Sequence, residues 1–174
     1  MTLVRRATNE DLAALSSLAA RLFPLGCVGT SEADLAAYIA TELTPARFGE
    51  YLADPNLVLL LAEDDGAPVG YLMLALRSVQ ELAAAHADAA TLGELRKLYV
   101  DPAHHGRGAA QELMHAALQV LQDSGAAAVW LSTYSLSLRA HAFYTRQGFV
   151  KVGEKLFQVG SDAQRDFVFL RQLS

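Results

Sequence analysis

The sequence predicts one mixed α/β domain over residues 1–174, with a mostly antiparallel central sheet flanked by helices. Short apolar runs of strand length alternate along the chain with segments of helical periodicity. Residues 57–76 form two apolar runs around the acidic, glycine-containing segment 63–66, which is the pattern of a β-hairpin. No repeat, linker or low-complexity tract divides the chain, and its length suits one hydrophobic core.

The first half of the chain predicts a strand, three helices and the hairpin. Thr8 is a good N-cap, and acidic residues follow it in the first turn, where the helix dipole favours them. Thr30 or Ser31 caps a second helix, and Pro45 suits the first position of a third. The expected elements are a strand at 3–6, helices beginning after Thr8, after Thr30 or Ser31, and at Pro45, and strands at 57–62 and 69–76.

The second half alternates strands and helices more regularly. Residues 78–91 are rich in alanine, and their pattern leaves both helix and loop open. Gly125 and Gly148 stand where two amphipathic patterns end, as expected for residues that terminate helices. The remaining expected elements are a strand at 92–100, a helix at 109–124, a strand at 127–133, a helix at 137–147 and strands at 149–159 and 167–172, the last two separated by a turn at 160–162.

Composition excludes several classes of function. The net charge of −5 gives no overall basic footprint for nucleic acid, and no apolar run approaches the length of a membrane-spanning helix. The single cysteine, Cys27, excludes an internal disulfide framework and a Cys-rich zinc site, so we interpret it as a small apolar residue. His104 and His105 lack partner ligands, so no metal site is expected. The N-terminus lacks the apolar stretch of a secretory signal, and a cytoplasmic location is predicted.

The most informative segment joins the strand at 92–100 to the helix at 109–124. Two glycines, Gly106 and Gly108, flank Arg107 immediately before the helix. Backbone N–H groups at a glycine-rich helix start bind anions, and Arg107 or His105 can add charge. A nucleotide-hydrolase loop would need Gly-Lys-Ser/Thr, and a dinucleotide fingerprint would need glycine at Gln111, so neither fits. A turn that merely begins a helix remains the alternative reading of the glycines.

A second motif follows about 40 residues later, in Phe143-Tyr144-Thr145-Arg146-Gln147-Gly148-Phe149. Together the two motifs resemble the GNAT superfamily of N-acetyltransferases, which joins a pyrophosphate-binding loop to a later helix ending in Phe-Tyr-x-x-x-Gly-Phe. The order of elements is similar to that family over nearly the whole chain. The resemblance implies a sheet that splays between the strands at 92–100 and 127–133 to admit the pantetheine arm of the cofactor.

The resemblance also implies acetyl-CoA, or another acyl-CoA, as co-substrate without a metal. The strand backbone at Leu98, Tyr99 and Val100 would bind the pantetheine arm, with a backbone N–H near Val100 polarising the thioester carbonyl. Ser137 stands where the family often has an asparagine that contacts pantetheine. His105 and Ala110 depart from the residues usual in the family's loop. The expected pyrophosphate ligands are His105, Gly106, Arg107, Gly108, Ala109 and Ala110.

Tyr144 and Glu94 are the candidate catalytic residues. A phenol stays protonated at neutral pH, so Tyr144 can donate a proton to the leaving thiolate; the alternative is that its ring only packs beside Phe143 and Phe149. Glu94 can accept the proton of the amine, although strand alternation places it on one face with Arg96 and Leu98, where a surface ion pair is equally expected. His141 precedes Tyr144 and is interpreted as a surface histidine.

The acceptor is expected to be the primary amine of a small molecule or peptide. Residues 23–45 and 157–167 resemble the bacterial branch related to spermine/spermidine acetyltransferases, and the acidic balance agrees with a polyamine. Ribosomal-protein N-termini, aminoglycosides and amino acids stay open, and a homodimer is compatible with the resemblance. The competing hypothesis is a non-catalytic domain that binds acyl-CoA as a sensor or regulatory module.

Overall fold

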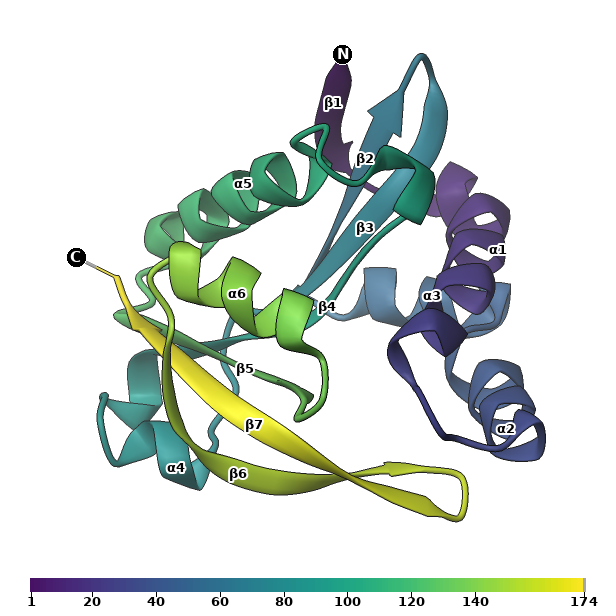
Figure 1. Ribbon diagram of the computed structural model, residues 1–174. Helices are drawn as coiled ribbons and strands as arrows, with labels where there is room; N and C mark the ends of the chain where they lie inside the picture. The colour runs from purple at the N-terminus through teal and green to yellow at the C-terminus, as the bar shows by residue number, and fades with distance from the viewer. Residues whose placement is uncertain (174) are drawn as a thin grey trace.

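A computed structural model describes residues 1–173, which form a seven-stranded sheet surrounded by helices (Figure 1). The strand order is β1-β2-β3-β4-β5-β7-β6, and every neighbouring pair is antiparallel except β4 with β5. The expected fold class, a mixed and mostly antiparallel sheet flanked by helices, is therefore confirmed.

The N-terminal elements agree closely with the sequence patterns. Thr8 begins the first helical segment with a reciprocal capping box to Asp11, and Ser31 rather than Thr30 caps the second helix. Thr44 caps the third, with Pro45 in its first turn. The elements are β1 (Thr2–Arg6), a 3-10 turn (Asn9–Asp11), α1 (Leu12–Leu22), a 3-10 turn (Phe23–Gly26), α2 (Glu32–Glu42), α3 (Pro45–Ala53), β2 (Leu57–Asp64) and β3 (Ala67–Ala75).

The C-terminal elements resolve one open segment and contain one departure from expectation. The undecided segment 78–91 forms α4 and a short 3-10 turn, held to the sheet by the fully buried Ala83. The last strand begins at Asp162, five residues earlier than expected. The elements are α4 (Glu81–Ala84), a 3-10 turn (Ala89–Thr91), β4 (Leu92–Val100), a 3-10 turn (Pro102–His104), α5 (Ala109–Asp123), β5 (Ala128–Tyr134), α6 (Leu138–Arg146), β6 (Val150–Val159) and β7 (Asp162–Gln172).

The helices lie on both faces of the sheet and create separate apolar clusters. Helix α5 packs on β1 to β4 from one face, where Leu113 and Met114 are fully buried. Helices α1 and α3 pack on β2 to β4 from the other face, where Leu15 and Phe48 are fully buried. Strand β4 therefore separates two cores, and side chains on its two faces enter different environments.

The sheet divides between β4 and β5. Their parallel pairing covers Leu92 to Glu94 on β4 and Ala128 to Trp130 on β5, and it stops there. Beyond this point β5 stays paired with β7 as far as Tyr134 opposite Asp166. The second half of β4 keeps β3 as its neighbour. The splay expected between these two strands is thus confirmed.

Strand β4 also contains a β-bulge that the alternation pattern did not anticipate. Lys97 pairs with Met73 and Leu95 pairs with Leu74, which leaves Arg96 as an extra residue. Leu95 and Leu98 consequently both face the α5 side, although they are three positions apart. The expectation of regular alternation through Glu94, Arg96 and Leu98 was wrong, because the bulge resets the alternation between Leu95 and Leu98.

Candidate active site

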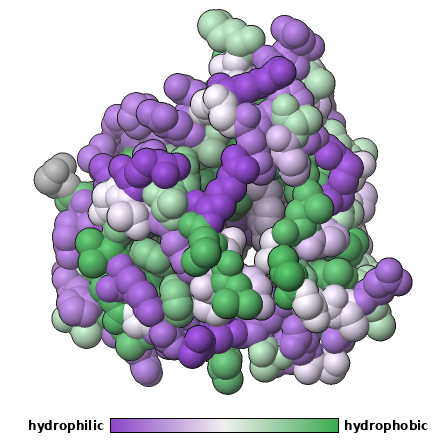
Figure 2. Space-filling model, in the orientation of Figure 1, coloured by the Kyte–Doolittle hydropathy of each residue, from purple (hydrophilic) through white to green (hydrophobic). Residues whose placement is uncertain are grey.

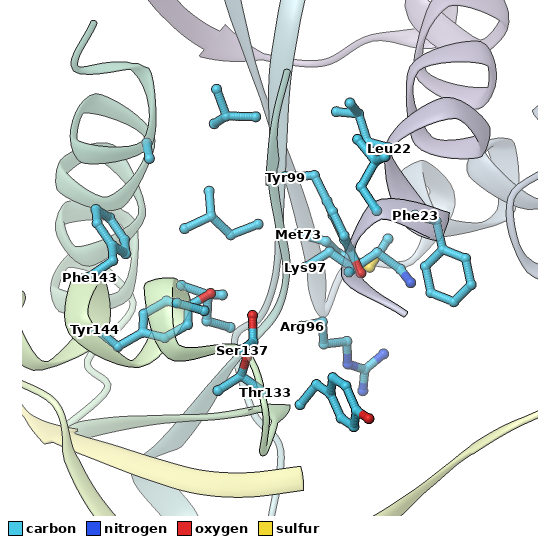
Figure 3. A pocket seen from close by; sticks show the side chains of 18 of the residues that line it. Leu22, Phe23, Met73, Arg96, Lys97, Tyr99, Thr133, Ser137, Phe143 and Tyr144 are labelled. Carbon is cyan, nitrogen blue, oxygen red and sulfur yellow. The ribbon is translucent and has the colours of Figure 1, made fainter. Parts of the chain in front are cut away.

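A cavity of about 870 Å³ opens where the sheet divides. Its walls come from β4 and the following loop, from the start of α5, from β5, β7 and α6, and from the segment joining α1 to α2. Figure 2 shows a hollow near the middle of this face, with hydrophobic side chains gathered on both sides. The close view shows Phe143 and Tyr144 on one side of β4, and Tyr99, Lys97 and Phe23 on the other (Figure 3).

The edge of β4 that faces the cavity carries free backbone polar groups. The N–H of Asp101 donates to the carbonyl oxygen of Val69 on β3 at 2.8 Å. Because N–H directions alternate along a strand, the N–H of Val100 points away from β3, toward the gap left by β5. The carbonyl of Val100 lies on this side too, 3.0 Å from Nε2 of His105. Leu98, Tyr99 and Val100 all line the cavity, as the sequence analysis expected.

The glycine loop forms an open cradle at the start of α5. Gly106 and Gly108 have φ angles of +77° and +89°, and no heavy atom lies within 4 Å of a Cβ built at either position. In the chain as described through residue 173, the N–H groups of Ala109, Ala110 and Gln111 have no hydrogen-bond acceptor. These unpaired donors and the positive end of the helix dipole make the cradle attractive to an anion.

One expected loop residue points elsewhere. The guanidinium of Arg107 is exposed and lies 3.8 Å from Oδ2 of Asp64 at the end of β2, and Arg107 does not line the cavity. His105, Gly106, Gly108, Ala109 and Ala110 do line it, as does Ser137 at the start of α6. The backbone of Arg107 lies in the cradle, but its side chain does not.

Tyr144 lies on the α6 wall, packed edge-to-face against Phe143 and Phe149. The residue is 8% exposed and lines the cavity. Burial raises the pKa of Tyr144 above its ordinary value, so the phenol keeps its proton at any physiological pH. The ring packing expected from the sequence is present, and the role of Tyr144 as an acid stays a prediction.

Glu94 stands at the last paired position before β4 and β5 separate. Its Oε2 accepts hydrogen bonds from Oγ of Ser78 at 2.6 Å and from Nε of Arg96 at 3.0 Å. The ion pair with Arg96 expected from the sequence is therefore present. Glu94 lines the cavity, but its carboxylate is already engaged by two donors.

Two charged residues that the sequence analysis did not select also line the cavity. Asp166 on β7 is 5% exposed, its Oδ1 has no hydrogen-bond partner among residues 1–173, and burial raises its pKa. Lys97 on β4 lies on the Tyr99 side, and burial lowers its pKa to about 8. If the last strand is taken to begin at Asp162, then Gln164, Asp166 and Val168 alternate on its buried face. This pattern would have identified Asp166 from the sequence.

Hydrogen bonds join the hairpin of β6 and β7 to the start of α2 and the residue before its cap, next to Gln164, which lines the cavity. The N–H of Ser161 donates to Oδ1 of Asp34 at 2.8 Å. Thr30 donates to Oδ2 of Asp162 at 3.1 Å, and the side-chain amide of Gln164 donates to the hydroxyl of Thr30. These contacts join segments about 130 positions apart, and only the tertiary fold brings them together.

The remaining candidates have structural surroundings. His141, expected at the surface, is half-buried: Nε2 lies 3.0 Å from the carbonyl of Tyr134, and the ring stacks on Phe167. The expectation was wrong because the last strand brings Phe167 under α6. Cys27 is buried, and burial raises the pKa of its thiol to about 11. Among residues 1–173, no group of three or more His, Cys, Asp or Glu side chains is arranged to hold a metal ion.

This chain belongs to the acetyltransferase (GNAT) family, whose model matches residues 19–149. It is 38% identical over 164 residues to an uncharacterised N-acetyltransferase of Mycobacterium bovis, a match that covers 94% of this chain and 98% of that protein. It is 37% identical over 107 residues to the mycothiol acetyltransferase of Beutenbergia cavernae, covering 61% of this chain and 32% of that protein. The expected family and the expected class of enzyme, an N-acetyltransferase, are confirmed.

Solved structures share the fold at low sequence identity. The PaiA N-acetyltransferase from Thermoplasma acidophilum, in complex with coenzyme A, superposes with a TM-score of 0.78 at 17% identity over 99% of both chains. The ribosomal-protein-alanine N-acetyltransferase from Brucella melitensis gives a TM-score of 0.73 at 20% identity, covering 98% of this chain and 99% of that one. None of the helices within residues 1–173 combines the length and apolar character that a membrane crossing requires.

Proposed function

We propose that the protein transfers the acetyl group of acetyl-CoA to a primary amine by direct attack on the thioester. The observation that carries this proposal is the single cavity that connects the glycine cradle, the free edge of β4 and Tyr144. The family supports the reaction class, and the arrangement supports a donor entering between β4 and β5.

The cradle fits the pyrophosphate of the donor. Three unpaired N–H groups at the start of α5 and the space in front of Gly106 and Gly108 suit a polyanion. Leu98, Tyr99, Val100 and Ser137 would hold the pantetheine arm in the gap between the strands. Arg107 would contribute through its backbone, since its side chain lies toward Asp64.

Acetyl-CoA supplies an activated acyl thioester, and the chain supplies polarisation and proton transfer. The N–H of Val100 would donate to the carbonyl oxygen as negative charge develops on it. The amine nitrogen bonds to the carbonyl carbon, the carbon–sulfur bond breaks, and Tyr144 would protonate the leaving sulfur. The raised pKa of Tyr144 ensures that the proton is available at neutral pH.

The attacking amine must lose a proton, and two carboxylates are candidates to accept it. Glu94 lies on the strand leading to the thioester site, but Ser78 and Arg96 already donate to it. Asp166 has an unpaired oxygen and a raised pKa, both of which favour proton acceptance. Glu94→Gln and Asp166→Asn would separate the two roles: the variant of the true acceptor lowers kcat most, and its loss is smallest at high pH, where the amine is already neutral.

Calorimetric titration with acetyl-CoA, followed by a thiol-release assay with a panel of amines, tests the proposed function. Binding in the micromolar range with release on at least one amine is expected. The panel includes spermidine, aminoglycosides, amino acids and peptides with free N-termini, so it also tests the narrower hypothesis of a polyamine acceptor. Binding of acetyl-CoA without thiol release in the presence of any amine would favour an acyl-CoA sensor. Absence of binding would mean that the glycine loop is only a turn that begins a helix. A cytoplasmic location and a homodimer stay predictions.

A further inference from the structure

The part of the cavity on the α1 and α2 side of β4 contains two opposite charges that the transfer of the acetyl group itself does not require. Lys97 enters it from β4 and Asp166 from β7. Figure 3 shows Lys97 beside Tyr99 and Phe23, across β4 from Tyr144. This is the side on which an acceptor can approach if the donor occupies the gap between β4 and β5.

The ammonium group of Lys97 has no carboxylate partner within residues 1–173. Its Nζ lies 3.2 Å from the hydroxyl of Tyr38 and 5.4 Å from the centre of that ring. The two carboxylates that act on the charge of Lys97 are engaged elsewhere, Glu94 with Arg96 and Glu42 with Arg47. No ion pair formed within residues 1–173 includes Lys97. A largely buried ammonium group without a counter-ion destabilises a protein, and such an arrangement is typical of a binding site.

Asp166 is the matching unpaired group of opposite sign. It is 5% exposed and has one oxygen without a hydrogen-bond partner. Lys155, its cross-strand neighbour on β6, lies over the ring of Trp130. Within residues 1–173, Lys155 forms no ion pair with Asp166. Both charges act on the thiol of Cys27. Burial raises the pKa of this thiol, Asp166 raises it further, and Lys97 lowers it.

The surrounding walls favour a small acceptor. Phe23 stacks on Tyr38 with ring centres 4.3 Å apart, and Phe157 meets Tyr38 edge-on at 6.2 Å. The contacts of Ser161 with Asp34 and of Thr30 with Asp162 join the β6–β7 hairpin to the α2 region. The three aromatic rings leave a compact space beside Lys97, which suits a small acceptor.

We infer that the acceptor is a small amino acid, whose carboxylate is bound by Lys97 and whose amine faces Asp166. The inference rests on the proposed function and narrows its acceptor from any amine to one that also carries an acidic group. A polycation meets Lys97 as a like charge, and like charges repel more strongly in a partly buried site than in water. Binding of a carboxylate instead supplies the counter-ion that Lys97 lacks.

The test is a thiol-release assay with acetyl-CoA and matched pairs of acceptors. Each pair joins an amino acid to its decarboxylated amine, for example phenylalanine with phenethylamine and lysine with cadaverine, and spermidine is included. The wild-type protein should prefer the amino acid of at least one pair in kcat/KM. In Lys97→Met that preference should fall by about 10- to 100-fold, the loss expected for one charge-assisted hydrogen bond.

Lys151→Met is the matched control. Lys151 also lies over an aromatic ring, that of Phe167, but it pairs with Glu154 and lies outside the cavity. This variant should keep the wild-type preference. Lys97→Arg, which retains the charge, should keep a larger share of the preference than Lys97→Met. Thermal unfolding and acetyl-CoA titration of every variant would verify that fold and donor site are intact.

The outcomes separate the inference from the function on which it rests. Release with spermidine or simple amines, without any pair that favours the amino acid, would overturn the inference and leave the proposed function standing. An equal preference in the wild-type protein and in Lys97→Met would overturn it too. No release with any acceptor despite acetyl-CoA binding would overturn the proposed function, and the inference with it.

Discussion

Glu94 and Trp130 are the last residue pair of the parallel ladder between β4 and β5, and Ser78 connects them. The hydroxyl of Ser78 donates to Glu94 at 2.6 Å, while its carbonyl accepts from Nε1 of Trp130 at 2.9 Å. The point at which the sheet divides is therefore braced by a residue outside both strands. Because the splay begins here, we expect the brace to limit the width of the gap into which the donor is proposed to enter.

Ser78→Ala should weaken this brace. It removes one hydrogen bond to a carboxylate, for which we expect a loss of about 1 kcal/mol in the free energy of unfolding. The affinity for acetyl-CoA should fall as well, because the gap loses rigidity. Urea unfolding and calorimetry measure the two effects. An unchanged unfolding midpoint would show that the hydroxyl does not stabilise the division of the sheet.

Tyr144→Phe should lower kcat by about 100-fold, within the range typical of a general acid, and leave acetyl-CoA binding unchanged. The ring keeps its contacts with Phe143 and Phe149, so the variant should remain folded. Steady-state kinetics over a range of pH, with thermal unfolding as a control, measure this. If the maximal rate and the pH–rate profile match those of the wild type, Tyr144 is not the acid.

Gly108→Glu should abolish measurable binding of acetyl-CoA while leaving the fold intact. The side chain would enter the open cradle and place a carboxylate where the pyrophosphate is proposed to bind. Gly66→Glu is the matched control, because Gly66 also has positive φ and open space around its Cβ position but belongs to the turn between β2 and β3. Both substitutions carry a backbone strain of about 1–2 kcal/mol. Equal dissociation constants of acetyl-CoA for the two variants would show that the loop is not part of the donor site.

Lys97→Met should stabilise the free protein at neutral pH by up to about 3 kcal/mol, the cost of shifting the lysine pKa from 10.5 to about 8. Because the folded pKa lies below the unfolded one, the unfolded state binds more protons between these values, and wild-type stability rises with pH there. The advantage of the variant is therefore complete below about pH 8 and fades toward pH 10.5. Urea unfolding of both proteins at several pH values measures the difference. A constant difference across this window would contradict the burial of the charge.

Gly160→Ala should disturb the contact between the β6–β7 hairpin and α2. A Cβ at this position would collide with the carboxylate of Asp34, which accepts from Ser161. The collision should separate the hairpin from α2 and raise KM for the acceptor, with little change for acetyl-CoA. Steady-state kinetics with the best acceptor of the panel measure both constants. A larger effect on acetyl-CoA than on the acceptor would show that this contact does not belong to the acceptor site.

The sequence alone was sufficient for most of the secondary structure and for the family, and it was the source of the proposed donor half of the candidate site. Hydrophobic periodicity, N-caps such as Thr8 and Thr44, and glycines that end helices are local signals, and each acts within a few residues of its element. The glycine loop and the motif around Tyr144 are each a continuous stretch of sequence. Their order and spacing indicated a shared site and a family. The early start of β7 was missed because its first residues are mostly polar.

The proposed acceptor half depends on the tertiary structure. Lys97 and Asp166 lie far apart in the sequence, and neither belongs to a local motif. The bulge at Arg96 resets the alternation of β4, and the splay after Glu94 opens the space between the two halves of the sheet. Burial then removes water from an ammonium and a carboxylate that would be ordinary surface charges in an isolated segment. Local patterns cannot report such charges, because their environment is created by elements distant in the chain.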